Sequence, residues 1–227
     1  ADPTEGFGHD LDNFLSCFLS SVTVIFIANP NNPTGTYLPL NRIEDFLKKL
    51  DSSVIVVLDE AYFEYSGQKR NSVELVSNFP NLLITRSFSK AYGLAALRIG
   101  YAIGSEKVIA YMNRVRQPFN VNSIAQKAAS IALDDNNFVK ESVELNDLNK
   151  GYLETSFKGF GIPYIKSNGN FFLVNVRNFT PICDGKIRSA GTTLASELSK
   201  NGVITRPVDN YDLPDWLRIS IGTESEN

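Results

Sequence analysis

The stretch Thr85-Arg86-Ser87-Phe88-Ser89-Lys90-Ala91-Tyr92-Gly93-Leu94 places one amine, that of Lys90, close to the hydroxyls of Ser87 and Ser89. A fixed cation, Arg98, follows eight residues after Lys90. An amine can form a Schiff base, and hydroxyl groups with a guanidinium can hold an anionic group. An isolated lysine is usually a surface residue, so the meaning of Lys90 depends on what the rest of the chain supplies.

The Lys90 stretch follows one of four short apolar segments that are typical of buried strands: 22–28, 54–58, 82–85 and 99–103. Between the first two segments, Pro39 begins a helical pattern in which the apolar positions are Leu40, Ile43, Phe46, Leu47 and Leu50. Strands that alternate with helices predict an α/β fold with a parallel or mostly parallel sheet. Ligands bind such sheets beyond the carboxyl ends of their strands, where Lys90 is expected.

The pattern changes from about residue 123 onward. Long helices are predicted over 124–133 and 138–157, and a strand over 170–176. A helix over 193–200 and strands near Val203 and Leu217 complete the predicted elements. The sequence therefore predicts a large α/β domain over residues 1–123 and a smaller α+β domain over residues 124–227.

The composition is that of an ordinary globular protein, with 227 residues, 43% hydrophobic residues and 21% charged residues. The net charge of -3 gives no basic surface for nucleic acid, and no apolar stretch is long enough to span a membrane. Two cysteines, Cys17 and Cys183, do not make a disulfide framework, so a cytoplasmic protein is expected. With His9 as the only histidine, a histidine-based metal site or a Ser-His-Asp hydrolase is not expected.

Three further groups of polar residues lie at or near the ends of predicted strands. The segment 29–35, Asn-Pro-Asn-Asn-Pro-Thr-Gly, follows the first strand, and the segment 59–62, Asp-Glu-Ala-Tyr, follows the second. Arg206 and Arg218 lie in the last part of the chain. An arginine within an apolar strand is costly unless it is paired, so Arg218 is expected to meet a carboxylate of a ligand or of the protein itself.

Together these motifs resemble the fold-type I pyridoxal-phosphate (PLP) aminotransferases, in the class II branch that includes histidinol-phosphate aminotransferase. The order and spacing of the motifs along nearly the whole chain carry this resemblance. The motifs are the segments 29–35, 59–62, 87–98, 117–122 (Gln-Pro-Phe-Asn-Val-Asn), 168–172 (Asn-Gly-Asn-Phe-Phe), 202–207 (Gly-Val-Ile-Thr-Arg-Pro) and 217–223 (Leu-Arg-Ile-Ser-Ile-Gly-Thr).

The resemblance implies PLP as the cofactor and assigns residues to it. Lys90 would bind the cofactor through its amine and later move a proton at the substrate α-carbon. Asp59 would face the pyridine nitrogen, and Asn32 and Tyr62 would hydrogen-bond the phenolic oxygen. The cofactor phosphate would be held by Ser87, Ser89 and Arg98.

The resemblance also implies the substrates, a small-molecule amino donor and a 2-oxo acid. Arg218 would bind the substrate α-carboxylate, with Asn170 nearby, and Arg206 would bind the phosphate of L-histidinol phosphate. The alternative for Arg206 is an ion pair with Asp209 or Asp212. The expected activity is amino transfer from histidinol phosphate to 2-oxoglutarate in histidine biosynthesis, by a cytoplasmic homodimer.

Other functions remain open at this point. The same cofactor-binding residues would serve an aminotransferase for aromatic amino acids or a decarboxylase of a phosphorylated amino acid. A regulatory domain with an aminotransferase-like fold and no catalysis is a further alternative. The upstream glycine-containing loop and the ring-stacking aromatic residue of complete family members are not found in this sequence, nor is their cross-dimer tyrosine. An N-terminally truncated chain is therefore expected, with an incomplete large domain and with an activity that the chain alone need not retain.

Overall fold

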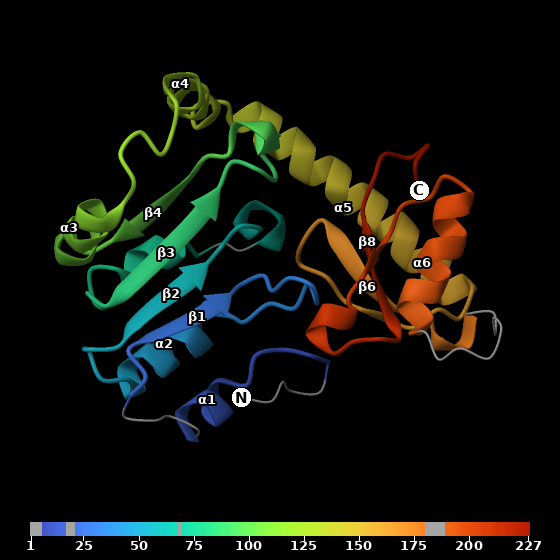
Figure 1. Cartoon of the computed structure of the whole chain (residues 1–227), viewed down its shortest axis with the longest axis horizontal. Helices are drawn as coiled ribbons and strands as arrows, with labels where there is room; N and C mark the ends of the chain where they lie inside the picture. The colour runs from blue at the N-terminus through green and yellow to red at the C-terminus, as the bar shows by residue number, and fades with distance from the viewer. Residues whose placement is uncertain (1–5, 17–20, 68–69, 180–188) are drawn as a thin grey trace. The chain divides into compact units, whose positions relative to one another are not determined.

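The computed structural model describes residues 6–16, 21–67, 70–179 and 189–227. The two cysteines lie outside these ranges. The chain divides into two compact units, one formed by residues 1–31 and 37–143 and the other by residues 32–36 and 144–227. Figure 1 labels most of their helices and strands. We describe the two as unit 1 and unit 2.

Unit 1 is built on a four-stranded sheet in the order β1-β2-β3-β4. Its strands are β1 (Val24–Ala28), β2 (Ile55–Asp59), β3 (Leu82–Ser87) and β4 (Gly100–Gly104). The first three strands run parallel, and β4 runs antiparallel to β3. This confirms the prediction of a mostly parallel sheet, and it brings the carboxyl ends of β2 and β3 side by side.

One helix covers the sheet of unit 1 through an apolar stripe. The helix α2 (Leu40–Lys49) follows Pro39, as predicted, and lies along β1 and β2 in Figure 1. Its buried side chains recur at helical spacing and meet alternate residues of the strands. This core contains Ile43, Phe46 and Leu47 of α2 with Ile25, Ile27, Val56, Leu58 and Ile84 of the strands.

Among the described residues, three more α-helices belong wholly to unit 1, namely α1 (Leu11–Ser16), α3 (Glu106–Val115) and α4 (Ser123–Ala132). The helix α4 matches the helix predicted over 124–133. The helices α1 and α3 were not predicted. None of the residues of α3 is buried, although its apolar residues Val108, Tyr111, Met112 and Val115 recur at helical spacing.

Unit 2 combines an antiparallel sheet with helices. Its strands, in the order β5-β6-β8-β7, are β5 (Tyr164–Ile165), β6 (Phe171–Asn175), β8 (Trp216–Ser220) and β7 (Arg206–Pro207). The helices are α6 (Ala190–Lys200) and the C-terminal part of α5 (Asn136–Gly159). The core joins Phe157, Phe172, Val174, Ala195 and Leu217. The α+β character predicted for this part of the chain is therefore observed.

The contact-based division falls within α5, between Val143 and Glu144, whereas the sequence pattern places a domain boundary near residue 123. The helix α4 and the start of α5 remain with unit 1 because they pack on it. The ring of Phe138 lies close to Gly93, and Ser142 hydrogen-bonds with Tyr65. A change in the sequence pattern shows where helices begin, but it does not show on which surface these helices pack.

Candidate functional site

Lys90 lies on a tightly bonded turn just beyond β3. The backbone N–H of Gly93 donates to the Lys90 carbonyl at 2.9 Å, and that of Leu94 donates to the Phe88 carbonyl at 2.9 Å. Gly93 has φ of 69°, a left-handed conformation that glycine adopts without steric cost. The side chains of Phe88 and Ala91 are buried on either side of Lys90. These hydrogen bonds and buried side chains therefore fix the turn, so that Lys90 holds its amine in one place.

The amine of Lys90 lies near groups from the end of β2. Its Nζ atom is 5.1 Å from the centroid of the Tyr62 ring. Asp59, the last residue of β2, is exposed and pairs in register with Thr85 of β3, and one of its oxygens accepts a hydrogen bond from the Ala61 N–H at 3.1 Å. Within the described ranges neither Asp59 nor Lys90 has an ion-pair partner. The strand ends thus offer a carboxylate and an amine that are both available to a ligand.

Ser87, Ser89 and Arg98 form a small group of hydrogen-bonding side chains in the same turn. The Ser87 hydroxyl accepts from the Ser89 N–H at 3.0 Å, and Arg98 donates to the Ser89 hydroxyl at 3.5 Å and to the Ala95 carbonyl at 2.9 Å. Arg98 adopts a left-handed φ of 52° at the end of a short 3-10 helix. No carboxylate of the described residues pairs with Arg98. This arrangement of hydroxyls and a guanidinium suits a phosphate group.

Unit 2 holds the second set of candidate residues, centred on Arg218 in β8. Arg218 donates to the side-chain oxygen of Asn32 at 2.7 Å, and its guanidinium carbon lies 5.2 Å from the centroid of the Phe171 ring. Its Nε atom is buried and has no hydrogen-bond partner. The ion pair with a protein carboxylate that the sequence left open is not found among the described residues. A buried donor without a partner is costly, so Arg218 suits an anionic ligand.

The two candidate arginines of unit 2 are direct cross-strand neighbours. Arg206 of β7 pairs in register with Arg218 of β8, and like charges in that relation repel each other. Arg206 forms no ion pair with Asp209 or Asp212 within the described chain, and Asp209 instead accepts a hydrogen bond from Thr192 at 2.8 Å. The pair therefore concentrates positive charge that the described protein residues leave uncompensated.

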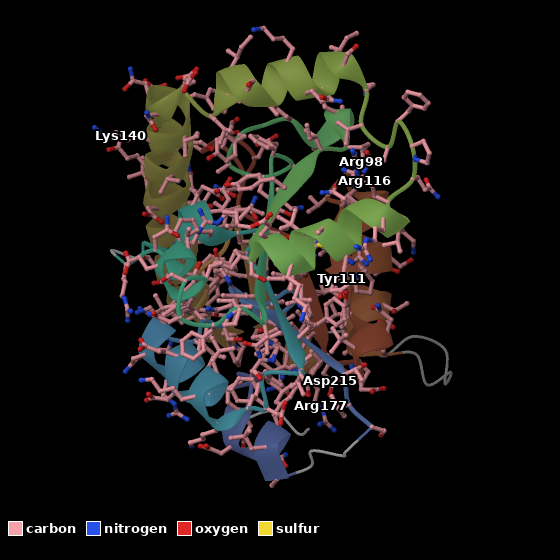
Figure 2. All side chains as sticks on the ribbon, turned by 90° about the vertical axis from the view of Figure 1, so that its left-hand side faces the viewer. Arg98, Tyr111, Arg116, Lys140, Arg177 and Asp215 are labelled. Atoms are coloured by element: carbon pink, nitrogen blue, oxygen red, sulfur yellow. The ribbon has the colours of Figure 1, made fainter. Side chains whose placement is uncertain are left out.

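Other polar residues of unit 2 have local partners. Arg177 forms an ion pair with Asp215 at 3.7 Å, and both residues are labelled in Figure 2. Asn170 comes directly before β6, and its backbone carbonyl accepts from the Ile221 N–H at 2.9 Å, which ties Asn170 to the segment after β8. The structure thus gathers Asn32, Asn170, Arg206 and Arg218 in one unit.

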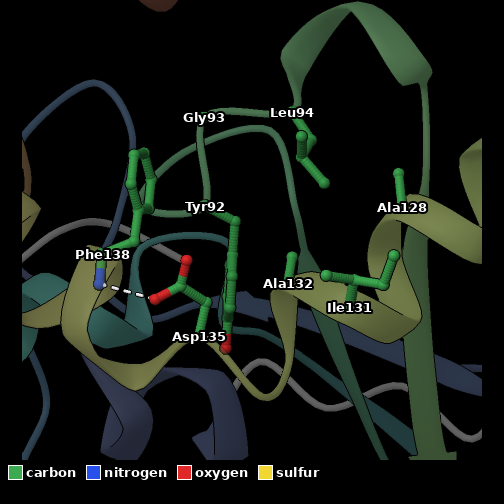
Figure 3. Close-up of a pocket in the computed structure, with 8 residues that line it drawn as sticks. All are labelled: Tyr92, Gly93, Leu94, Ala128, Ile131, Ala132, Asp135 and Phe138. Atoms are coloured by element: carbon green, nitrogen blue, oxygen red, sulfur yellow. Dashed lines mark hydrogen bonds between the residues drawn. The ribbon is translucent and has the colours of Figure 1, made fainter.

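An apolar pocket of about 430 Å³ lies beside the end of the Lys90 turn in unit 1. Tyr92, Gly93 and Leu94 line it from the turn, and α4 and the start of α5 supply the other walls, as Figure 3 shows. Burial, together with the charge of Glu64, raises the pKa of Tyr92 to about 12, so its hydroxyl stays neutral. The sequence did not predict this pocket, because its walls come from segments about forty residues apart.

The single histidine takes part in local structure. The ring Nε2 of His9 lies 2.9 Å from the Ala28 carbonyl, and burial lowers the pKa of His9 although this hydrogen bond opposes the shift. Within the described part of the chain, no three metal-ligating side chains gather in one place. No helix there combines the length and the apolar content needed to cross a membrane.

Comparison with known proteins identifies one matching family and several similar proteins. The family described as aminotransferase class I and II matches residues 1–227. Histidinol-phosphate aminotransferase 2 of Ralstonia nicotianae is 48% identical over 99% of this chain, and histidinol-phosphate aminotransferase 1 of Cupriavidus pinatubonensis is 48% identical over 97%. The chain covers 59% and 57% of these two relatives.

A solved structure shows the same fold. The crystal structure of histidinol-phosphate aminotransferase from Sinorhizobium meliloti, in complex with pyridoxal-5'-phosphate, has a TM-score of 0.85 and 29% sequence identity. The match covers 96% of this chain and 58% of that one. The fold class expected from the motifs is therefore confirmed, and the chain belongs to the aminotransferase class I and II family.

Proposed function

We propose that the natural protein to which this chain belongs is a PLP-dependent aminotransferase. It transfers the amino group of L-histidinol phosphate to 2-oxoglutarate, in histidine biosynthesis. The observation that carries the proposal is the Lys90 turn, where an amine adjoins two hydroxyls and an arginine without a carboxylate partner in the described chain. The names of relatives with 48% identity support the choice of donor.

The residues of unit 1 suit PLP as a cofactor. Lys90 would bind it covalently through its amine, and Ser87, Ser89 and Arg98 would hold its phosphate. Asp59 accepts a hydrogen bond from the protonated pyridine nitrogen. The absence of a cationic partner for Asp59 among the described residues supports this role, because the carboxylate is then available to the ring. Tyr62 donates a hydrogen bond to the phenolic oxygen.

The residues of unit 2 bind the substrate and one atom of the cofactor. Arg218 holds the α-carboxylate by two parallel hydrogen bonds, a geometry for which the planar guanidinium is suited. Asn32, which already contacts Arg218, donates from its amide to the phenolic oxygen, and Asn170 lies beside the carboxylate. Arg206 binds the phosphate of the donor. The repulsion between Arg206 and Arg218 is relieved when both meet anionic groups.

The chemistry requires one proton to be moved at the substrate α-carbon. When bound, PLP supplies an electron sink for the negative charge that forms on this carbon. The amine of Lys90 would take the α-proton as a general base. Arg218 would bind the α-carboxylate and so hold the substrate in one orientation.

The natural protein is also proposed to be a cytoplasmic homodimer. The resemblance to the aminotransferases supports the dimer, and the small number of cysteines supports a reducing compartment. Sedimentation of the natural protein across a range of concentrations tests the dimer. A species of single-chain mass at all concentrations would contradict it.

Substrate choice is tested by kinetics of the natural protein with histidinol phosphate, histidinol and phenylalanine as donors. Arg206→Gln is expected to raise KM for histidinol phosphate by about tenfold or more, because a charge-assisted contact contributes roughly 1.5–3 kcal/mol. KM for histidinol, which lacks the phosphate, should stay nearly unchanged.

The matched control is Arg177→Gln, which removes an arginine of the same unit whose partner is Asp215. This variant should behave as the wild type with all three donors. Faster turnover of phenylalanine than of histidinol phosphate would refute the proposed donor. Release of carbon dioxide without any requirement for a 2-oxo acid would indicate a decarboxylase instead.

A further inference from the structure

The ends of β2 and β3 are joined by a buried ion pair between Glu60 and Arg86. One terminal nitrogen of Arg86 lies 2.8 Å from Oε2 of Glu60, and Nε donates to the same oxygen at 2.9 Å. The two side chains are only 5% and 8% exposed. In nine other ion pairs of the described residues, at least one partner is about half exposed or more. The Glu60–Arg86 pair therefore differs in kind from the surface pairs.

Both residues adjoin the candidate cofactor-binding residues in the sequence. Glu60 directly follows Asp59, and Arg86 directly precedes Ser87. Successive side chains of an extended chain point to opposite faces, which agrees with the exposure of Asp59 and the burial of Glu60. The backbone N–H of Glu60 also donates to the Thr85 carbonyl at 2.8 Å. The ion pair thus locks the two strand ends from the face opposite to Asp59 and Ser87.

Arg86 is held by further contacts. The same terminal nitrogen that contacts Glu60 also donates to Oδ1 of Asn71 at 2.8 Å, and the guanidinium carbon lies 3.8 Å from the centroid of the Phe63 ring. The Arg86 carbonyl approaches Gly100 so closely that a Cβ atom there would lie 2.6 Å from it. Together these contacts fix the backbone that leads into Ser87.

A buried ion pair is a poor means of stabilising a fold. Burial raises the pKa of Glu60, although the charge of Arg86 opposes the shift. Two apolar side chains of similar size often stabilise a core as well as such a pair or better. An ion pair does, however, impose one geometry on the two backbones that carry it. The pair lies behind the candidate site, where a fixed backbone geometry helps to position the residues that bind a ligand.

We propose that the Glu60–Arg86 pair is a positioning element for cofactor binding. It fixes the carboxyl ends of β2 and β3, so that Asp59 and the Ser87–Lys90 turn keep the geometry that PLP requires. Glu60 and Arg86 themselves touch neither cofactor nor substrate. The inference rests on the proposed function, because it concerns the residues that bind the cofactor there.

The test uses the natural protein with the variants Glu60→Gln, Arg86→Gln, the double variant of both, and Glu60→Asp. The dissociation constant of PLP and the pH midpoint of the absorbance change of bound PLP are measured for each. Each single variant should weaken PLP binding by about tenfold or more, as in metal sites that lose an orienting partner, and should shift the pH midpoint. The loss of PLP-binding free energy in the double variant should be smaller than the sum of the two single-variant losses, because the double variant leaves no unpaired buried charge.

Glu60→Asp keeps the charge but shortens the side chain, so it is expected to fold and still bind PLP more weakly. Glu74→Gln is the matched control, because Glu74 is an exposed carboxylate whose partner is Arg70, and both measured quantities should be unchanged. If Glu60→Gln and Glu60→Asp fold and keep the wild-type affinity for PLP and the wild-type pH midpoint, the positioning role is overturned. This holds even if their Tm values are lower. If the wild type itself forms no PLP absorbance band, the proposed function fails first and this inference falls with it.

Discussion

Glu64 is a partly buried residue whose carboxyl Oε2 atom is buried and has no hydrogen-bond partner. Burial raises its pKa, and the charge of nearby Glu60 adds to the shift, while Arg86 opposes it. The guanidinium of Arg86 already bonds Glu60, so it cannot fully compensate a second carboxylate. At the scale of single residues, the interior beside the candidate site therefore holds one acid that is paired and another that is not.

A carboxyl group with a raised pKa makes the protein less stable as the pH rises. Its contribution is fully present below the unfolded pKa, near 4.5, and is lost as the pH increases through the higher folded value. Glu64→Gln removes this loss. We expect its Tm to exceed that of the wild type by roughly 2–4 °C at pH 8, equivalent to about 1 kcal/mol, with little difference at pH 4. Thermal unfolding across that pH range measures the effect.

The control for this prediction is Glu74→Gln, which removes an acidic group that is exposed to solvent. Its Tm should depend on pH in the same way as that of the wild type. If Glu64→Gln destabilises the protein more at pH 8 than at pH 4, the carboxylate of Glu64 is stabilised by its surroundings, and the interpretation of its burial is wrong.

At the scale of elements, the strands could be predicted because their apolar runs are continuous and local. The direction of β4 could not, since the connection from β3 to β4 is a turn built around Phe88, Gly93 and Arg98 rather than a crossover helix. The pairing of Arg86 with Glu60 was not predicted either. The one available signal was a charged residue within a strand, which shows that a partner must exist but not which residue it is.

The close approach of β3 and β4 makes Gly100 the most constrained residue of the β4 edge. A Cβ atom at this position would lie 2.6 Å from the Arg86 carbonyl, which is too close for any atom pair of this kind. Gly100→Ala is expected to push β4 away from Ser87 and to cost about 2 kcal/mol or more of unfolding free energy, as overpacking of a tight contact does. Urea unfolding measures the loss.

Gly151 offers a matched control in the middle of α5, where an added Cβ meets no atom within 4 Å. Gly151→Ala should stabilise the protein by roughly 0.5–1 kcal/mol, since glycine is a poor helix former. A Gly100→Ala variant that is as stable as the wild type would show that β4 can move without cost.

At the scale of the whole molecule, the order of the motifs predicted the fold because each motif has its own chemical task. The same motifs did not predict which unit each one joins. Residues 32–36 belong with β8 in unit 2, where Asn32 meets Arg218, although they follow β1 of unit 1 in the sequence. That association depends on contacts over more than a hundred residues of chain, such as that between the Asn168 N–H and the Gly35 carbonyl. Such distant contacts leave no periodic signal in the sequence.

The most direct test of the account is the absorbance of the natural protein mixed with PLP. A Schiff base between PLP and Lys90 should give a band near the visible edge that reduction with borohydride fixes on the protein. Lys90→Ala should abolish both the band and the covalent label, while Lys107→Ala, on the exposed helix α3, should retain them. A band and a label that persist in Lys90→Ala would contradict the central claim.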